Sequence, residues 1–139
     1  MTVIIIIDDE YVYTANVGDS KAVLTKQRKS QATLDYETFQ LSIDHKPADL
    51  KEKKRILKCN GDVKQSLNRN GNPVGIYRVW LKDRDMPGLA MSRSIGDKLA
   101  QSVGVIPDPD ISIYRLNKED FDYLIVSASD GLWDALTTN

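Results

Sequence analysis

Three aspartates stand at positions from which their carboxylates could act together. Asp130 follows an apolar run that predicts a buried strand, and it directly precedes Gly131. Asp134 lies one helical turn further along, so both carboxylates can share one face of a helix. Asp19 follows another expected strand. Because clustered carboxylates repel one another unless a cation compensates them, this pattern favours a site for a metal ion.

Each aspartate also has a structural interpretation. A short polar side chain such as Asp19 is common in turns, where it hydrogen-bonds nearby backbone. Asp134, in the first turn of an expected helix, interacts favourably with the helix dipole whether or not a metal is present. Residue types and spacing alone therefore leave both roles open.

Cysteine and histidine usage restricts the possible chemistry. Cys59 and His45 are the only residues of their types, which excludes an internal disulfide, a cysteine-rich zinc site and a multi-histidine metal site. No arginine follows Cys59 closely, and the end of an expected helix disfavours a thiolate, so Cys59 is interpreted as a packing residue. The remaining carboxylates, hydroxyls and backbone groups suit Mg²⁺ or Mn²⁺.

The charge balance argues against two kinds of partner. The 139 residues include 19 Lys and Arg and 20 Asp and Glu, for a formal net charge of -1. We therefore expect no nucleic acid partner and no polybasic membrane-binding face. The longest apolar run, residues 3–7, is too short to span a bilayer.

Strands dominate the expected secondary structure. Residues 3–7 are all β-branched, which predicts a strand buried on both faces and the first of a three-stranded meander. Ile111 and Ile113 alternate with polar residues, as in a half-buried strand. Residues 123–129 form a nearly continuous apolar run, typical of a central strand. The other expected strands cover residues 11–17, 21–25, 39–41 and 75–81.

Helices are expected in two places. Asp49 with Glu52 three residues later is a helix-start signal, and Leu50 and Leu57, with Ile56 beside them, give this helix a narrow apolar stripe. Residues 132–136 predict the first turn of a second helix. Strands with interspersed helices indicate the α+β class, in which Trp80 and Trp133 are expected to pack in cores or domain seams.

Four segments carry a resemblance to a known family. They are residues 16–24 (NVGDSKAVL), 44–47 (DHKP), 87–97 (PGLAMSRSIGD) and 127–134 (SASDGLWD). In this order they resemble the motifs of the type 2C metal-dependent serine/threonine protein phosphatases. The resemblance spans nearly the whole chain but only a middle portion of the family's catalytic domain, so residues 1–139 are expected to be a partial domain, truncated at both ends.

The resemblance implies a fold and a mechanism. The fold would be part of an antiparallel β-sandwich with flanking helices. In the family, the aspartate matching Asp130 ligates a two-metal centre, and those matching Asp19 and Asp134 contribute to a further, weaker metal site. The implied reaction on phosphoprotein substrates is direct attack of a metal-activated water on phosphorus, with no phosphoenzyme.

Other family elements do not occur in this sequence. The D-G-H-G segment, the later D-N segment and an upstream phosphate-binding arginine are absent, so the chain alone is expected to hydrolyse phosphoesters feebly or not at all. Arg93 and Asp97 are interpreted as an internal scaffold pair rather than a phosphate clamp. His45 is interpreted as a turn-stabilising residue, because the family's catalytic histidine belongs to the absent motif.

One alternative stays open: a family member that has lost catalysis and serves as a binding or scaffold module. The resemblance also suggests an intracellular protein, cytoplasmic or nuclear. Sheet edges and apolar faces exposed by truncation would favour self-association of the chain.

Overall fold

The computed structural model describes residues 2–30 and 35–136. The chain divides into two compact units, unit 1 (Met1–Asp44 and Pro109–Asn139) and unit 2 (His45–Asp108). Antiparallel sheets with a few short helices make up both units, which confirms the predicted α+β class. No helix in the described part of the chain is long and apolar enough to cross a membrane.

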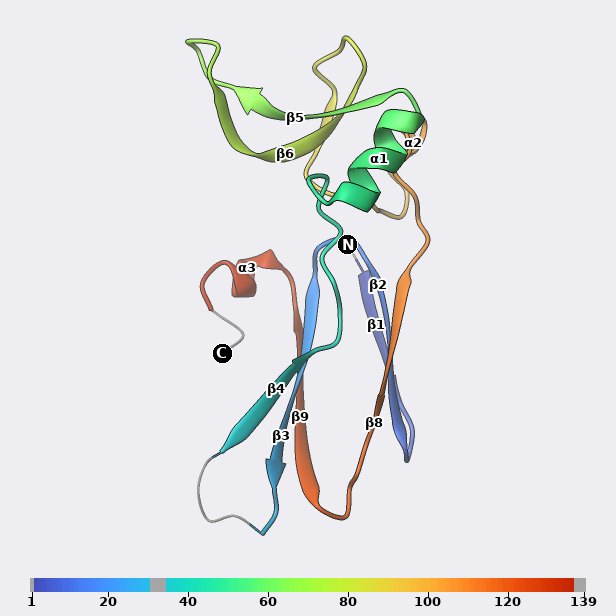
Figure 1. Cartoon of the computed structure of the whole chain (residues 1–139), viewed down its shortest axis with the longest axis vertical. Helices are drawn as coiled ribbons and strands as arrows, with labels where there is room; N and C mark the ends of the chain where they lie inside the picture. The colour runs from blue at the N-terminus through green and yellow to red at the C-terminus, as the bar shows by residue number, and fades with distance from the viewer. Residues whose placement is uncertain (1, 31–34, 137–139) are drawn as a thin grey trace. The chain divides into compact units, whose positions relative to one another are not determined.

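Unit 1 contains two antiparallel sheets (Figure 1). In the first, β2 (Tyr11–Val17) lies between β1 (Thr2–Ile7) and β8 (Asp110–Arg115). In the second, β3 (Lys21–Arg28) lies between β4 (Tyr36–Gln40) and β9 (Phe121–Ala128), and the short helix α3 (Asp130–Trp133) follows β9. The run ending at Ala128 is therefore an edge strand of the described sheet, not the central strand that its apolar sequence predicted.

The core of unit 1 lies between the inner faces of these sheets. Val12 of β2 and Leu24 of β3 are fully buried, and Phe39, Tyr114 and Tyr123 pack against them. The rings of Phe39 and Tyr114, one from each sheet, lie 5.3 Å apart between centroids. Contributions from both sheets to one apolar cluster confirm the predicted antiparallel sandwich.

The predicted meander is wrong. β1 and β2 form a hairpin, but β3 pairs with β4 and β9 rather than with β2. The segment around Gly18 therefore leads the chain from one sheet to the other. Gly18 has a φ of 108°, which a residue with a side chain rarely adopts, so a glycine is required for this change of direction.

The outer face of the first sheet differs from the sequence prediction. Ile4 and Ile6 of β1 are 53% and 61% exposed, so β1 is buried on one face only. Ile111 and Ile113 of β8 are also exposed, while Ser112 and Tyr114 are turned inward. The alternation of inward and outward side chains along β8 was predicted correctly. The side expected to be buried is the exposed one, because tertiary packing decides which face is inside.

Unit 2 consists of a three-stranded sheet and two helices. The strands β5 (Gly61–Leu67), β6 (Pro73–Leu81) and β7 (Pro87–Leu89) pair in this order, accompanied by α1 (Leu50–Lys58) and α2 (Lys98–Gln101). Their shared core is aliphatic and consists of Ile56, Val63, Val79, Ala100, Val103 and Val105. A Cβ added at Gly61 would lie 2.7 Å from Ile56 Cγ2, so the approach of α1 to β5 requires glycine there.

Helix α1 begins as predicted but turns a different face inward. The Asp49 side chain accepts hydrogen bonds from the backbone N–H of Lys51 and Glu52, as an N-cap does. Glu52 and Ile56 are buried, whereas Leu50 and Leu57 are 85% and 49% exposed. Of the predicted apolar stripe, Ile56 is therefore buried as expected, whereas the two leucines face solvent, because the helix also turns Glu52 inward to its polar partners.

Candidate functional site

Strand pairing places Asp19 and Asp130 at the same end of one ladder. Along β3 and β9, Lys21 pairs with Ala128 and Ala22 with Ser127. Asp19 precedes Lys21 by two residues and Asp130 follows Ala128 by two, so both aspartates flank the same end of the ladder. Residues more than a hundred positions apart in the sequence thus flank the same end of the β3–β9 ladder.

Trp133 closes that end of the ladder. Its indole N–H donates to the backbone oxygen of Lys21 at 3.1 Å and to that of Ala128 at 2.9 Å. These carbonyls belong to the last residue pair of the ladder. Trp133 thereby holds α3, and with it Asp130, against the strand ends.

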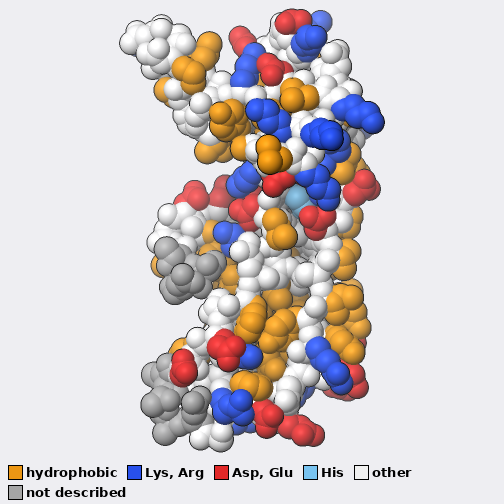
Figure 2. All heavy atoms as spheres, in the orientation of Figure 1, with side chains coloured by type: hydrophobic (Ala, Val, Ile, Leu, Met, Phe, Trp, Pro, Cys, Tyr) orange, Lys and Arg blue, Asp and Glu red, His pale blue; other side chains and the backbone are white. Residues whose placement is uncertain are grey.

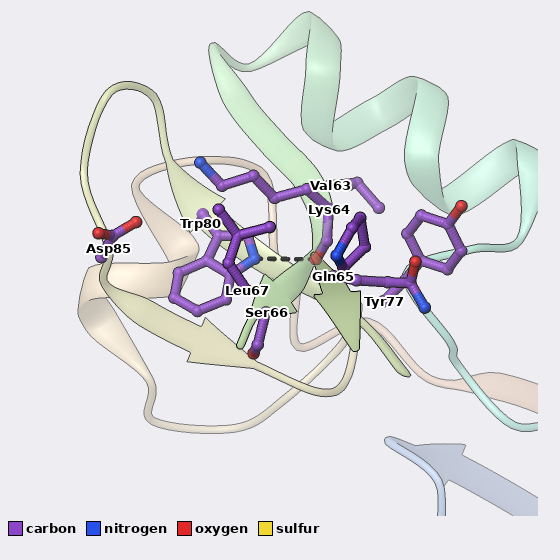
Figure 3. Close-up of a pocket in the computed structure, with 9 residues that line it drawn as sticks. Val63, Lys64, Gln65, Ser66, Leu67, Tyr77, Trp80 and Asp85 are labelled. Carbon is purple, nitrogen blue, oxygen red and sulfur yellow. Dashed lines mark hydrogen bonds between the residues drawn. The ribbon is translucent and has the colours of Figure 1, made fainter. Parts of the chain in front are cut away.

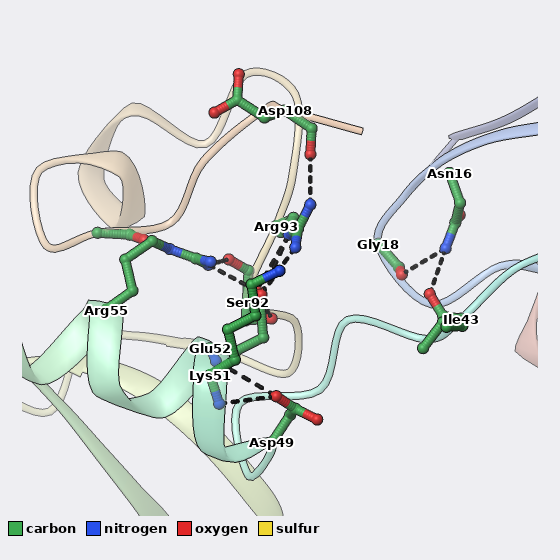
Figure 4. A network of polar contacts seen from close by, with 11 residues as sticks. Asn16, Gly18, Ile43, Asp49, Lys51, Glu52, Arg55, Ser92, Arg93 and Asp108 are labelled. Atoms are coloured by element: carbon green, nitrogen blue, oxygen red, sulfur yellow. Dashed lines mark hydrogen bonds and ion pairs between the residues drawn. The ribbon is translucent and has the colours of Figure 1, made fainter. Parts of the chain in front are cut away.

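Asn16 fixes the segment that carries Asp19. Its side-chain amide is buried and donates to the backbone oxygens of Gly18, at 3.3 Å, and Ile43, at 2.8 Å (Figure 4). Asp19 itself is 8% exposed. Its carboxylate is therefore set in a defined turn rather than on a free loop.

Asp130 and Asp134 occupy the two ends of α3. Asp130 is exposed, and its Oδ1 accepts from the N–H of Gly131 at 3.0 Å. The N–H of Asp134 donates to the backbone oxygen of Asp130 at 2.8 Å, which closes one helical turn. Both side chains are thus on the surface and on the same side of α3, as their spacing predicted.

The donor chemistry of these aspartates suits a hard divalent cation. Carboxylate oxygens are the ligands that Mg²⁺ and Mn²⁺ prefer. A Cβ added at Gly131 would meet only Ser129 Oγ, at 3.8 Å, so the protein leaves room beside Asp130. Among the described residues, however, no three Asp, Glu, His or Cys side chains gather closely enough to form a metal site. The chain therefore supplies suitable ligands without completing a coordination sphere.

A second polar cluster lies inside unit 2 and surrounds Glu52 (Figure 4). Its carboxylate is 2.9 Å from Arg93 Nη2 and 2.7 Å from Arg55 Nη2, and it accepts a hydrogen bond from Ser92 Oγ at 2.7 Å. Arg93 also donates to the backbone oxygen of Asp108 at 3.0 Å. Burial opposes ionisation, but the bonds from Arg55, Arg93 and Ser92 outweigh it and lower the pKa of Glu52 from 4.5 to about 2.

This cluster corrects one detail of the sequence interpretation. Arg93 is an internal scaffold residue, 5% exposed, but its carboxylate partner is Glu52 rather than Asp97. Asp97 is exposed and precedes α2. His45 is buried, and its backbone oxygen accepts from the N–H of Ser92 at 2.9 Å, which places it in the scaffold of unit 2.

Sequence reasoning missed the positioning roles of Asn16, Trp133 and Glu52. Glu52 was treated only as part of a helix-start signal, and its burial could not be foreseen without knowing which face of α1 is covered. Trp133 was expected only to pack. An asparagine two residues before a turn glycine, as Asn16 is before Gly18, is a usable signal, because a buried amide must find backbone partners.

Comparisons of the sequence and of the structure with known proteins all point to one family. The family model "Protein phosphatase 2C" matches residues 1–139. The chain is 39% identical over 92% of its length to "Probable protein phosphatase 2C 48" of Oryza sativa subsp. japonica, of which it covers 35%. It is 40% identical over 98% of its length to "Probable protein phosphatase 2C 18" of Arabidopsis thaliana, of which it covers 25%. The chain thus spans about a quarter to a third of the length of these relatives.

Solved structures share the fold. A serine-threonine phosphatase 2C from Toxoplasma gondii superposes with a TM-score of 0.79 over 98% of this chain and 42% of that one, at 24% identity. A phosphatase from a pathogenic strain of Toxoplasma gondii gives a TM-score of 0.63 at 29% identity, over 93% of this chain and 34% of that one.

Proposed function

Because the chain belongs to the protein phosphatase 2C family, we propose that it forms part of a metal-dependent phosphatase that hydrolyses phosphoserine and phosphothreonine in proteins. The observation that carries this proposal is the β3–β9 register, which brings Asp19 and Asp130 to one end of the ladder. A shared edge with acidic residues from separate segments is a suitable place for cations that bind through oxygen.

Each aspartate has a distinct part in the proposed site. Asp130, exposed on α3 beside the room left at Gly131, would hold a catalytic Mg²⁺ or Mn²⁺. Asp19 and Asp134 would serve a further ion. When bound, such ions lower the pKa of a coordinated water and neutralise charge on the phosphoryl oxygens. Trp133 and Asn16 act as positioning residues, since they fix the backbone that carries Asp130 and Asp19.

The chain by itself is proposed to be inactive or nearly so. Its relatives extend well beyond the matched region, and the described residues hold no group of three ligands that could bind a metal. Further ligands would then come from sequence outside these 139 residues. The phosphatase activity is accordingly assigned to the longer protein.

The test is hydrolysis of p-nitrophenyl phosphate with and without Mn²⁺, by this chain and by a version extended at both ends to the length of the family's catalytic domain. We expect metal-dependent turnover only from the extended version, and we expect Asp130→Asn to abolish it. Asp122→Asn is the matched control: Asp122 is an exposed aspartate of β9, eight residues from Asp130, and it pairs with Gln27 towards the other end of the ladder. This control should keep its activity.

Two results would count against the proposal. Strong turnover by the 139-residue chain would show that it needs no further ligands. An extended version that is folded, binds phosphoprotein and shows no turnover with any divalent metal would favour a binding or scaffold module. Calorimetric titration of Mn²⁺ into both versions separates loss of metal binding from loss of catalysis.

A further inference from the structure

The charges of the two units are strongly opposed. Unit 2 holds 13 of the 19 basic residues and 7 of the 20 acidic residues, so its formal net charge is +6, while unit 1 carries -7. The net charge of -1 over the whole chain hides this division. A positive region of this size attracts acidic partners over roughly 8 Å at physiological ionic strength.

The lysines of α1 are the available part of this positive charge. Figure 2 shows lysine and arginine side chains gathered on unit 2. Arg55 and Arg93 are engaged with Glu52 inside the unit. Lys53 and Lys54, by contrast, have no carboxylate within 4.0 Å among the described residues; Lys54 is exposed and Lys53 is half-buried. They are free to meet an acidic partner.

Apolar side chains are interleaved with these lysines. Leu50, Lys53, Lys54 and Leu57 follow the spacing of one helical face, and the two leucines are 85% and 49% exposed. The Lys53 ammonium lies 5.6 Å from the ring centroid of Tyr77, which is itself 42% exposed. Exposed leucine side chains are costly to hydrate. A helix face that presents them beside lysines without an ion pair therefore suits a partner with both acidic and apolar residues.

This face continues into a groove along β5 and β6. The groove has a volume of about 560 Å³, and its lining includes Tyr77, Trp80, Lys64 and Leu67 (Figure 3). The indole N–H of Trp80 donates to the backbone oxygen of Lys64 at 2.9 Å, which fixes the ring in the groove wall. Tyr77 lines the groove, and its ring also contacts Lys53 of α1. The groove and this face of α1 therefore form one surface.

We propose that this surface, the Leu50–Lys53–Lys54–Leu57 face of α1 together with the Tyr77–Trp80 groove, docks an acidic segment of the phosphoprotein substrate. The proposal rests on the proposed phosphatase function and adds a substrate class to it: phosphoproteins that carry a segment with Asp or Glu residues and an apolar residue. The carboxylates meet Lys53 and Lys54, and an apolar side chain enters the groove. A concave groove with fixed aromatic walls fits an inserted side chain better than a flat bilayer, and the leucines offer nothing to nucleic acid.

The test is a direct binding measurement, made without metal so that it does not depend on catalysis. Fluorescence anisotropy would compare a labelled peptide with four Asp or Glu residues around a Leu and a phosphothreonine with a peptide in which Asn and Gln replace the acids. We expect the acidic peptide to bind at least about tenfold more tightly, with an affinity that falls as salt rises. Replacing phosphothreonine by threonine should preserve most of the preference, because docking is separate from the aspartate site.

Variants locate the effect. Lys53→Glu with Lys54→Glu should weaken acidic-peptide binding about tenfold, because it removes two attractions and adds two repulsions. Leu50→Ser with Leu57→Ser, both exposed, should weaken it without affecting folding. Lys98→Glu with Lys82→Glu is the matched control: both lysines are exposed in unit 2 and the net charge changes equally, yet binding should change less than about twofold.

Several outcomes would overturn the proposal. Equal affinity for the acidic and neutral peptides would do so, and so would an equal loss in the control variant, which would indicate net charge alone. Tighter binding of duplex DNA or of phosphatidylserine vesicles with the same variant pattern would assign the surface to a different partner. If the extended protein hydrolyses acidic and neutral phosphopeptides with the same KM, docking fails while the phosphatase function stands. If the extended protein binds the acidic peptide but shows no turnover of any phosphopeptide, the phosphatase function fails while docking stands.

Discussion

Units 1 and 2 place their charged side chains in opposite ways. Unit 1 packs two sheets through apolar and aromatic residues and carries its candidate functional acids at strand ends, outside that core. Unit 2 has a smaller aliphatic core and buries the carboxylate of Glu52 beside Arg93, which is 5% exposed. Carboxylates thus stabilise the fold of unit 2, whereas those at the strand ends of unit 1 are the ones proposed to bind an ion.

The difference follows from what surrounds each carboxylate. Asp130 is exposed, so its charge stays hydrated and can be lost with little effect on folding. Glu52 joins α1 to the segment of Ser92 and Arg93, so its charge is balanced only while the unit is folded. Substitutions should therefore separate the two units, one in stability and the other in function.

The largest expected effect is the removal of Glu52. Glu52→Ala removes the buried carboxylate that Arg93, Arg55 and Ser92 contact, which should lower the free energy of unfolding of unit 2 by about 3–5 kcal/mol. Urea unfolding would be followed by the fluorescence of Trp80 in unit 2 and of Trp133 in unit 1, each in a background where the other is Phe. We expect the Trp80 transition to shift to lower urea concentration by more than the Trp133 transition.

Asp130→Asn is the comparison for that experiment. Because Asp130 is exposed and outside the core, this change should alter the unfolding free energy by less than about 0.5 kcal/mol. If it destabilised the chain as much as Glu52→Ala does, the contrast between a functional acid and a scaffold acid would not hold.

Acid should destabilise the chain through the same carboxylate. The pKa of Glu52 lies at about 2 in the folded chain and near 4.5 when unfolded. A lowered folded pKa means that the stabilisation is complete above about pH 4.5 and is lost as pH falls toward 2. The loss amounts to about 3 kcal/mol, and it should disappear in Glu52→Gln. Urea midpoints between pH 7 and pH 2.5, read from Trp80, would show it; an equally steep pH dependence in Glu52→Gln would assign it to other groups.

Local features of both units could be predicted from the sequence, whereas features that depend on tertiary packing could not. The ends of β2 and the N-cap at Asp49 were predicted correctly, because they depend on local backbone preferences. The inward face of α1 and the phase of Ile111 and Ile113 were not, because periodicity shows alternation but not which side meets a partner. Of the proposed metal site, the motifs named the candidate residues, and only the β3–β9 pairing showed that Asp19 and Asp130 flank the same end of one ladder.

The isoleucine face of unit 1 leads to a prediction on self-association. Across the first sheet, Ile6 is aligned with Tyr13 and Ile113, and both isoleucines are about 60% exposed. We propose that two copies of the 139-residue chain pair through this face, because contiguous exposed aliphatic side chains on a sheet favour association. Ile6→Lys with Ile113→Lys should raise the dimer dissociation constant at least about tenfold in sedimentation velocity.

Exposed positions in unit 2 give the control for self-association. Leu50→Lys with Leu57→Lys adds the same charge to another exposed apolar pair and should leave the dissociation constant of the dimer nearly unchanged. A chain that stays monomeric at all accessible concentrations would contradict the proposal. A dimer weakened only by the α1 variant would place the contact in unit 2 instead.

A smaller loss of stability than that of Glu52→Ala is expected at the end of the β3–β9 ladder. Trp133→Phe keeps an aromatic ring but removes the N–H that donates to the backbone oxygens of Lys21 and Ala128. Loss of these bonds, with both carbonyls accessible to water at the strand ends, should cost about 1 kcal/mol. Thermal unfolding by circular dichroism would measure it, and amide hydrogen exchange should show faster opening of α3 than of β2. In the extended protein the same variant should weaken Mn²⁺ binding more than it lowers stability, because Trp133 holds the segment that carries Asp130. A loss of stability with unchanged Mn²⁺ affinity would show that Trp133 supports only the fold, and that the acids at the strand ends are positioned without it.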